Sequence, residues 1–343
     1  MVGVPVGPRI LSVTPHSAQG LRPASLTFYG APPCAPGAVP DADVAFVGVP
    51  FDLGTTLRPG ARFGPAAVRA ASAWYRYIDD DGKAAGGWFD LDLGRWILQG
   101  ITMADCGDVE IAPADITANL ERITEGVAAI VGAGRLPVIV GGDHSITYPA
   151  LRAFAGRGPL HVVQFDTHQD FVDERRGTRL GHGNVMRRAS ELPFVTGISQ
   201  IGIKGLQKYP EPLSAAQTYG ARIVTASALR RDGPEAAARS VPAGAACYLT
   251  VDIDVLDIAQ APGTGTPEPG GLTYRELCEV ARAVVNRGRV VGLDLVEVSP
   301  PYDWAEVTAR SAARLVLDVL AAIFARESEG RPVIQAAAEE GRA

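Results

Sequence analysis

The sequence has few cysteines and no long apolar run. Its four cysteines, Cys34, Cys106, Cys247 and Cys278, are widely spaced and form no Cys-x-x-Cys pair, which excludes a disulfide-rich secreted scaffold. We therefore expect reduced, mostly buried thiols. No segment approaches the ~18 consecutive apolar residues of a membrane helix, and prolines interrupt the start where a signal peptide needs an apolar stretch. The sequence predicts a soluble cytoplasmic protein without a membrane partner.

Blocks of like charge are also absent from the sequence. The chain of 343 residues has 32 Lys and Arg against 38 Asp and Glu, a net charge of −6. A phosphate-neutralising surface is not indicated, so we expect no nucleic-acid partner. The mild acidic excess favours a cation as ligand. A hydrophobic content of 47% supports a large core and excludes a disordered chain.

Short runs rich in β-branched residues alternate with segments of helical spacing between residues 43 and 326, which indicates βαβ units in one doubly wound domain. We interpret residues 1–42, with eight of the 26 prolines, as an irregular arm and residues 327–343 as a polar tail. The expected strands are 44–49, 137–140, 160–165, 200–203, 222–224, 247–251 and 290–295. The expected helices are 64–73, 114–132, 148–155, 181–191, 233–239, 273–287 and 304–325.

Start signals support two of these helices. Asp115 and Thr273 are in N-cap position, and Glu276 stands in capping-box register with Thr273. An irregular stretch from Asp79 to Gly100 carries three large aromatic side chains. We expect it to be a surface connector that covers the sheet edge or contacts another subunit, and the alternative is a lid over the active site.

Acid and histidine clusters follow three of the expected strands. Strand 137–140 leads to Asp143 and His144, strand 160–165 leads to the run 166–170, and strand 247–251 leads to the run 252–254. Ligands of parallel α/β sheets bind outside the carboxyl ends of the strands. His16 and His161 belong to no cluster, and we interpret them as structural residues.

A spacing of two residues places alternate side chains of an extended backbone on one face. Imidazole and carboxylate ligands without a thiolate suit manganese better than a structural zinc site. Six ligands are too many for one ion that keeps an open position, and four aspartates balance the charge of two divalent ions. The sequence therefore predicts a two-metal hydrolase site formed by His144, Asp166, His168, Asp170, Asp252 and Asp254.

Over nearly all of 43–326 the chain resembles the ureohydrolase family, the arginases and agmatinases. The resemblance rests on GGDHSITYPAL (141–151), FDTHQD (165–170), GHGNVMRRA (181–189), the run 250–276 and DLVEVSPPYD (294–303). It implies a three-layer α/β/α domain with a central, mainly parallel eight-stranded sheet. It also implies that Asp166 and Asp252 bridge two ions, with Mn²⁺ favoured and Ni²⁺ or Co²⁺ as alternatives.

The same resemblance implies the roles of the remaining site residues. Asp170, His182 and Glu297 would be catalytic: Asp170 passes a proton to the departing amine, His182 shuttles protons and Glu297 faces the guanidinium. Substrate contacts would come from His182, Asn184, Thr266 and Glu297. The expected reaction hydrolyses a small cationic guanidino substrate to urea and an amine, in a homo-oligomer, a trimer or hexamer, with a hetero-oligomer left open.

Two departures from the family pattern concern metal and substrate. Gln164 stands where the family usually has histidine, and Gly181 and 184–186 depart from the agmatinase loop sequence. Agmatine is the favoured substrate. Arg176, Arg179, Arg187 and Arg188 are either solvated surface residues or a site for a carboxylate tail, so 4-guanidinobutyrate, guanidine and N-alkylated guanidines or biguanides remain alternatives.

Three readings from other classes remain for testing. A single-zinc deacetylase-like hydrolase would share the architecture but has no use for the second metal site that Asp170 and Asp254 complete. A regulatory subunit of a mixed oligomer usually has a broken ligand set, whereas this one is complete. A dinucleotide enzyme is disfavoured because the glycines at 263 and 265 lack the third glycine of the phosphate-binding motif.

Overall fold

The computed structural model describes residues 21–22, 26–34, 38–39, 41–76 and 87–325. In this part of the chain, eight parallel strands form the central sheet, and β1 (Leu21–Arg22) joins one edge by antiparallel pairing to β5. The strand order is β1-β5-β2-β6-β11-β10-β7-β8-β9. The parallel strands are β2 (Val44–Val49), β5 (Met103–Val109), β6 (Leu136–Gly141), β7 (Leu160–Phe165), β8 (Val195–Ile203), β9 (Arg222–Thr225), β10 (Ala246–Asp252) and β11 (Arg289–Val296).

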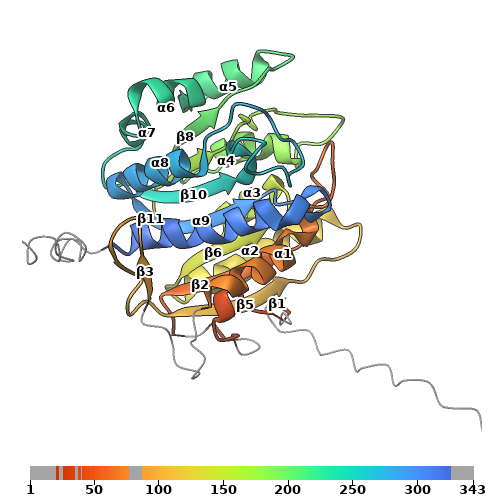
Figure 1. Cartoon of the computed structure of the whole chain (residues 1–343). Helices are drawn as coiled ribbons and strands as arrows, with labels where there is room; N and C mark the ends of the chain where they lie inside the picture. The colour runs from red at the N-terminus through yellow and green to blue at the C-terminus, as the bar shows by residue number, and fades with distance from the viewer. Residues whose placement is uncertain (1–20, 23–25, 35–37, 40, 77–86, 326–343) are drawn as a thin grey trace, which may run out of the picture.

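Helices cover both faces of this sheet, with α1 and α9 in front of it in Figure 1. One core contains side chains from α1 (Gly64–Ser72), α6 (Ala226–Asp232), α7 (Glu235–Ser240), α8 (Tyr274–Arg287) and α9 (Val307–Ile323). The other contains side chains from α2 (Ile116–Gly132), α3 (Thr147–Arg152), α4 (Val185–Ser190) and α5 (Glu211–Tyr219). Successive β2 residues alternate between the two cores, as strand geometry requires: Phe46 lies in the first and Val47 in the second.

Short 3-10 helices form many of the connections. They are η1 (Phe28–Gly30), η2 (Ala61–Phe63), η3 (Ala73–Tyr75), η4 (His144–Ile146), η5 (His182–Asn184), η6 (Ile253–Val255), η7 (Pro300–Tyr302) and η8 (Trp304–Glu306). Three of them carry site residues: η4 begins at His144, η5 begins at His182, and η6 contains Asp254 directly after β10. In the described ranges, no helix is long and apolar enough to span a bilayer.

The three-layer fold with its eight parallel strands confirms the expected fold class. Each expected strand is present within a few residues, and the expected helix at 181–191 is η5 followed by α4. Asp115 accepts a hydrogen bond from the amide of Ala118, and Thr273 and Glu276 form the predicted capping box. Strand β5 and helices α5 and α6 were not expected.

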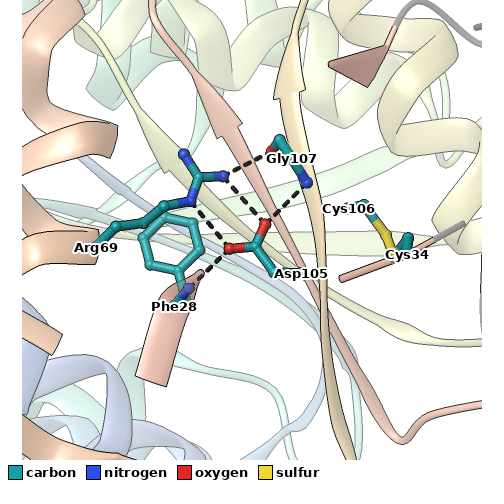
Figure 2. The surroundings of a disulfide bond; sticks show 6 residues. All are labelled: Phe28, Cys34, Arg69, Asp105, Cys106 and Gly107. Carbon is teal, nitrogen blue, oxygen red and sulfur yellow. Dashed lines mark hydrogen bonds and ion pairs between the residues drawn. A yellow bond between two sulfur atoms is a disulfide. The ribbon is translucent and has the colours of Figure 1, made fainter. Parts of the chain in front are cut away.

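The prediction of four reduced cysteines is wrong for one pair. Cys34 and Cys106 form a disulfide, whereas Cys247 and Cys278 are free. The bond attaches the segment before β2 to strand β5, beside a buried ion pair in which the Arg69 Nε donates to Asp105 over 2.9 Å (Figure 2). The two cysteines are 72 residues apart, so only the pairing of distant segments brings them together.

The stretch from Asp79 to Gly100, which we expected to be a surface connector with a lid as the alternative, contains a hairpin in its described part, residues 87–100. Strands β3 (Trp88–Asp90) and β4 (Arg95–Ile97) pair with each other, and the Asp90 carboxylate accepts from Arg314 on α9 over 2.8 Å. Leu93 lies beside Ala322, close to the C-terminal end of α9. Because α9 runs antiparallel to the strands, this end of the helix lies at the amino ends of the parallel strands. Residues 87–100 therefore cover the edge far from the strand carboxyl ends, which contradicts the lid interpretation.

Candidate metal centre

Four adjacent strands deliver the acidic and histidine residues of the candidate site. In the sheet order β6-β11-β10-β7, His144 follows β6, Glu297 follows β11, Asp252 ends β10 and Asp166 follows β7. All four strands are parallel, so their carboxyl ends meet at the same edge. These four residues are buried, at 0–3% exposure. The local sequence thus builds one polar cluster on an apolar sheet.

The first group surrounds the Nδ1 atom of His144. This nitrogen lies 3.1 Å from Asp166 Oδ2, 3.0 Å from Asp170 Oδ2 and 3.3 Å from Asp252 Oδ2. The other ring nitrogen, Nε2, is 2.9 Å from the Thr250 hydroxyl, which fixes the ring orientation. One imidazole nitrogen therefore faces three carboxylates.

The second group surrounds His168. Its Nδ1 lies 3.1 Å from Asp254 Oδ2 and 3.6 Å from Asp166 Oδ1, so Asp166 belongs to both groups with one oxygen in each. Asp252 Oδ1 accepts from the amide of Asp254 over 2.9 Å, which leaves its Oδ2 for the first group. The Thr266 hydroxyl donates to Asp254 Oδ2 over 3.1 Å.

The electrostatics of this cluster fit two cations. Burial, and then the neighbouring Asp254, raises the pKa of Asp252 well above its ordinary value. Burial opposes charge on His144 as well, yet Asp166, Asp170 and Asp252 raise its pKa. His144 Nδ1 has no hydrogen-bond partner despite its burial. A divalent ion among these oxygens and nitrogens would relieve the repulsion and satisfy that atom.

Glu297 and His182 form a pair beside the two groups. Their atoms Oε1 and Nδ1 are 2.9 Å apart, and His182 Nε2 is 2.8 Å from the Thr56 hydroxyl. Burial lowers the pKa of His182, but Glu297, with Asp170 and Asp143, raises it to about 9. Glu297 Oε1 also accepts from the His144 amide, whereas its Oε2 is buried without a partner. A Cβ atom added at Gly265 would lie 3.3 Å from that oxygen.

Asn184 lies close to this pair, but both ends of its amide are bound by the backbone. Its Oδ1 accepts from the Gly181 amide over 3.0 Å, and its Nδ2 donates to the Val172 carbonyl over 2.8 Å. These bonds hold the loop that carries His182. They do not support the expected contact between Asn184 and a substrate.

Sequence reasoning missed two of the site's neighbours. Thr250 contacts His144 Nε2, and its position two residues before Asp252 on an extended strand was a usable signal. Thr56 contacts His182 from an irregular loop 126 residues away, and no local pattern points to it.

The arginines noted near the site are mostly paired. Arg179 and Arg188 bind the Asp173 carboxylate, and Arg187 lies 3.6 Å from Glu191. Arg176 is exposed on the loop before them. Arg179 and Arg187 therefore match the alternative of surface arginines, whereas Arg188 is buried, at 5% exposure.

His161 lies away from the metal groups. Its Nε2 is 2.9 Å from the Ser199 hydroxyl, and it is buried at 5% exposure. His161 is thus a structural residue, as interpreted from the sequence. His16 lies outside the described residues.

Comparison with known proteins identifies the family. The model of the arginase family matches residues 42–322, and the chain belongs to this family. It is accordingly an amidinohydrolase, an enzyme that hydrolyses carbon–nitrogen bonds. The family membership and the two His/Asp groups define a binuclear metal enzyme.

Individual relatives agree with the family assignment. The chain is 39% identical over 290 residues to the human protein "Guanidino acid hydrolase, mitochondrial", covering 82% of this chain and 78% of the relative. It is 39% identical over 284 residues to "Agmatinase, mitochondrial" of Gallus gallus, covering 81% and 80%. The structure of proclavaminate amidino hydrolase from Streptomyces clavuligerus is similar with a TM-score of 0.76 at 34% identity, covering 90% of this chain and 99% of that one.

Proposed function

We propose that the protein hydrolyses a guanidino compound to urea and an amine. The observation that carries this proposal is the free oxygen of Glu297. Oε2 belongs to a residue of 1% exposure, has no hydrogen-bond partner and lies next to Gly265. A guanidinium group offers N–H donors in a plane and keeps its charge, so it would satisfy this oxygen.

The two groups around Asp166 would hold two divalent ions, and Mn²⁺ is the ion we propose, with Ni²⁺ or Co²⁺ as alternatives. His144, Asp166, Asp170 and Asp252 would hold one ion, and Asp166, His168, Asp252 and Asp254 the other. When bound, such ions acidify a water molecule to a nucleophile near neutral pH.

The chain's own groups then bind the substrate and move protons. Glu297 binds the guanidinium, and His182, held between Glu297 and Thr56, exchanges protons at its ring nitrogens. Asp170 has the most exposed side chain among the acid ligands, at 12%, and we propose that it passes a proton to the departing amine. Thr266 orients Asp254. Asn184 holds the His182 loop.

The variant Asp170→Asn tests the proton transfer. We expect kcat to fall by about 10²–10⁴-fold, since a positioned acid or base contributes that much, while the fold is retained. Urea release measures the rate, and two metal ions per chain, counted by mass spectrometry, show that the loss does not come from an empty site. Turnover equal to the wild type at full metal content would remove Asp170 from the mechanism.

Agmatine is the substrate we propose first, and a guanidino acid is the second candidate. The observation for the second is Lys204, which is partly buried next to the site. Its Nζ donates to the Glu268 carbonyl over 2.9 Å, and its charge interacts with that of Asp254. A cation at this position attracts a carboxylate tail and repels the ammonium of agmatine. The human relative's name also specifies a guanidino acid.

Urea release on protein loaded separately with Mn²⁺ and Ni²⁺ decides between these substrates. The panel contains agmatine, 4-guanidinobutyrate, arginine, guanidine and N-methylated guanidines. Lys204→Met should raise kcat/KM for agmatine relative to 4-guanidinobutyrate if the lysine selects the tail. No urea from any compound with both ions bound would contradict the proposed reaction. One tightly held zinc with deacetylase activity would favour the other class.

We also propose that the enzyme is a homo-oligomer, a trimer or hexamer, in the cytoplasm. Exposed apolar side chains support an interface. Leu57, Phe63 and Trp304 are 55–81% exposed. Light scattering of the purified chain measures the assembly, and activity of that chain alone distinguishes a homo-oligomer from a subunit that needs a second chain.

A further inference from the structure

Gln164 is the last polar side chain of β7 before the metal cluster and is completely buried. Its Nε2 donates to Asp166 Oδ2 over 2.6 Å and lies 3.3 Å from the His168 carbonyl. The other carboxylate oxygen, Asp166 Oδ1, accepts from the His168 amide over 2.5 Å. Each oxygen of the shared carboxylate therefore has one N–H donor, and the two donors fix the plane of the carboxylate.

A glutamine can present either its donor or its acceptor, and Gln200 on β8 decides which end of Gln164 faces Asp166. The Gln200 Nε2 donates to Gln164 Oε1 and to the Gln169 carbonyl, both over 2.6 Å. If the Gln200 amide were reversed, its oxygen would face two other oxygens. If the Gln164 amide were reversed, its oxygen would face the Asp166 carboxylate.

The orientation has a visible cost at Gln200. Its Oε1 is buried and has no hydrogen-bond partner. Buried amide oxygens are rarely left unpaired, so the two donor bonds of the Nε2 atom outweigh the loss at this acceptor. The side-chain amides of Gln164 and Gln200 thus have one stable arrangement, in which the neutral Gln164 amide donates to the Asp166 carboxylate.

We propose that Gln164 is a positioning residue for the metal-bridging Asp166, and that Gln200 acts through it by fixing the orientation of its amide. The donor holds Oδ2 towards the first group and leaves Oδ1 for the second. Such outer partners of a ligand tune metal affinity. This inference rests on the proposed two-metal site.

The test measures metal affinity directly. Gln164→Met keeps the volume of the side chain but removes the donor. We expect the dissociation constant for Mn²⁺, from competition with a chelating dye, to rise about 10–100-fold. Gln200→Met keeps the Gln164 donor but no longer fixes the orientation of its amide, so the dissociation constant for Mn²⁺ should rise less than in Gln164→Met. The pattern should also appear with Ni²⁺.

Ser199→Ala is the matched control, because Ser199 precedes Gln200 on β8 and its buried hydroxyl bonds His161 and the Ser240 carbonyl instead. It should lower thermal stability without changing the dissociation constant. An unchanged constant in Gln164→Met, or equal rises in all three variants, would overturn the positioning role while leaving the proposed function intact. A wild-type protein that binds no divalent ion would overturn both.

Discussion

At the scale of single residues, burial in the folded protein favours the neutral form of the His161 side chain. Burial, and then the nearby Arg222, lowers its pKa to about 4 from an unfolded value of about 6.5. Below pH 6.5 the unfolded chain binds a proton that the folded chain does not, so this residue reduces stability as the pH falls towards 4.

The variant His161→Gln should therefore flatten the pH dependence of stability. Denaturant unfolding at pH 7 and pH 5 should show a smaller loss on acidification in the variant than in the wild type. Titrating groups at the metal cluster are the same in both proteins and cancel in the comparison. An identical loss in the two proteins would show that His161 is not the group that titrates.

Residue-level prediction worked where a strand end carries the geometry: Asp166 follows β7 and Asp252 ends β10, and both lie beside His144. The period of two does not explain the cluster, because residues 166–170 form no strand and Asp170 has a positive φ of 49°. Sequence reasoning could not reveal the contact between Thr56 and His182, since this contact depends on where a loop lies in space. The substrate contact of Asn184 stays a prediction, since a motif match gives a position but not which hydrogen bonds its amide makes.

At the scale of elements, the capping box of α8 makes a contribution to stability that can be measured. Thr273 accepts from the Glu276 amide, and the Glu276 carboxylate accepts from the Thr273 amide over 2.7 Å. Thr273→Ala should cost about 1 kcal/mol of unfolding free energy, because the amide of Glu276 loses its hydroxyl acceptor. Arg275→Ala on the exposed face of the same helix is the control. Equal losses would mean that the cap has no special effect.

The elements missed from the sequence share a weak apolar pattern. Helix α5 buries only Ala216, so it has no apolar stripe for periodicity to detect. Strand β5 carries Asp105 and Asp108, which read as loop residues in isolation. In the fold, both acids pair with the buried Arg69, and a strand becomes acceptable there.

At the scale of the molecule, the Cys34–Cys106 bond closes a long loop. With a separation of 72 residues, the chain-entropy model gives a stabilisation of about 4 kcal/mol. Reduction by a thiol should lower the melting temperature of the wild type. Cys34→Ala should melt at that lower temperature with or without reductant. A melting temperature of the wild type that is the same with and without reductant would contradict this stabilisation.

The metal cluster links stability to its ligands. Without cations, Asp252 and its acidic neighbours repel each other in a buried site. A metal concentration 100-fold above the dissociation constant should add about 3 kcal/mol. The melting temperature should therefore be lower with a chelator than with Mn²⁺. The difference between these two temperatures should be smaller in Asp252→Asn than in the wild type. Melts that coincide with and without Mn²⁺ would contradict this linkage.

The position of β11 sets an order of events during synthesis. Among the described strands it is the last along the chain, yet it lies between β6 and β10, which carry His144 and Asp252. Both metal-binding residues are therefore synthesised before β11, the strand that separates β6 from β10 in the sheet. The cluster is therefore complete only after residue 297 has been synthesised, and we expect the ions to bind after β11 has joined the sheet.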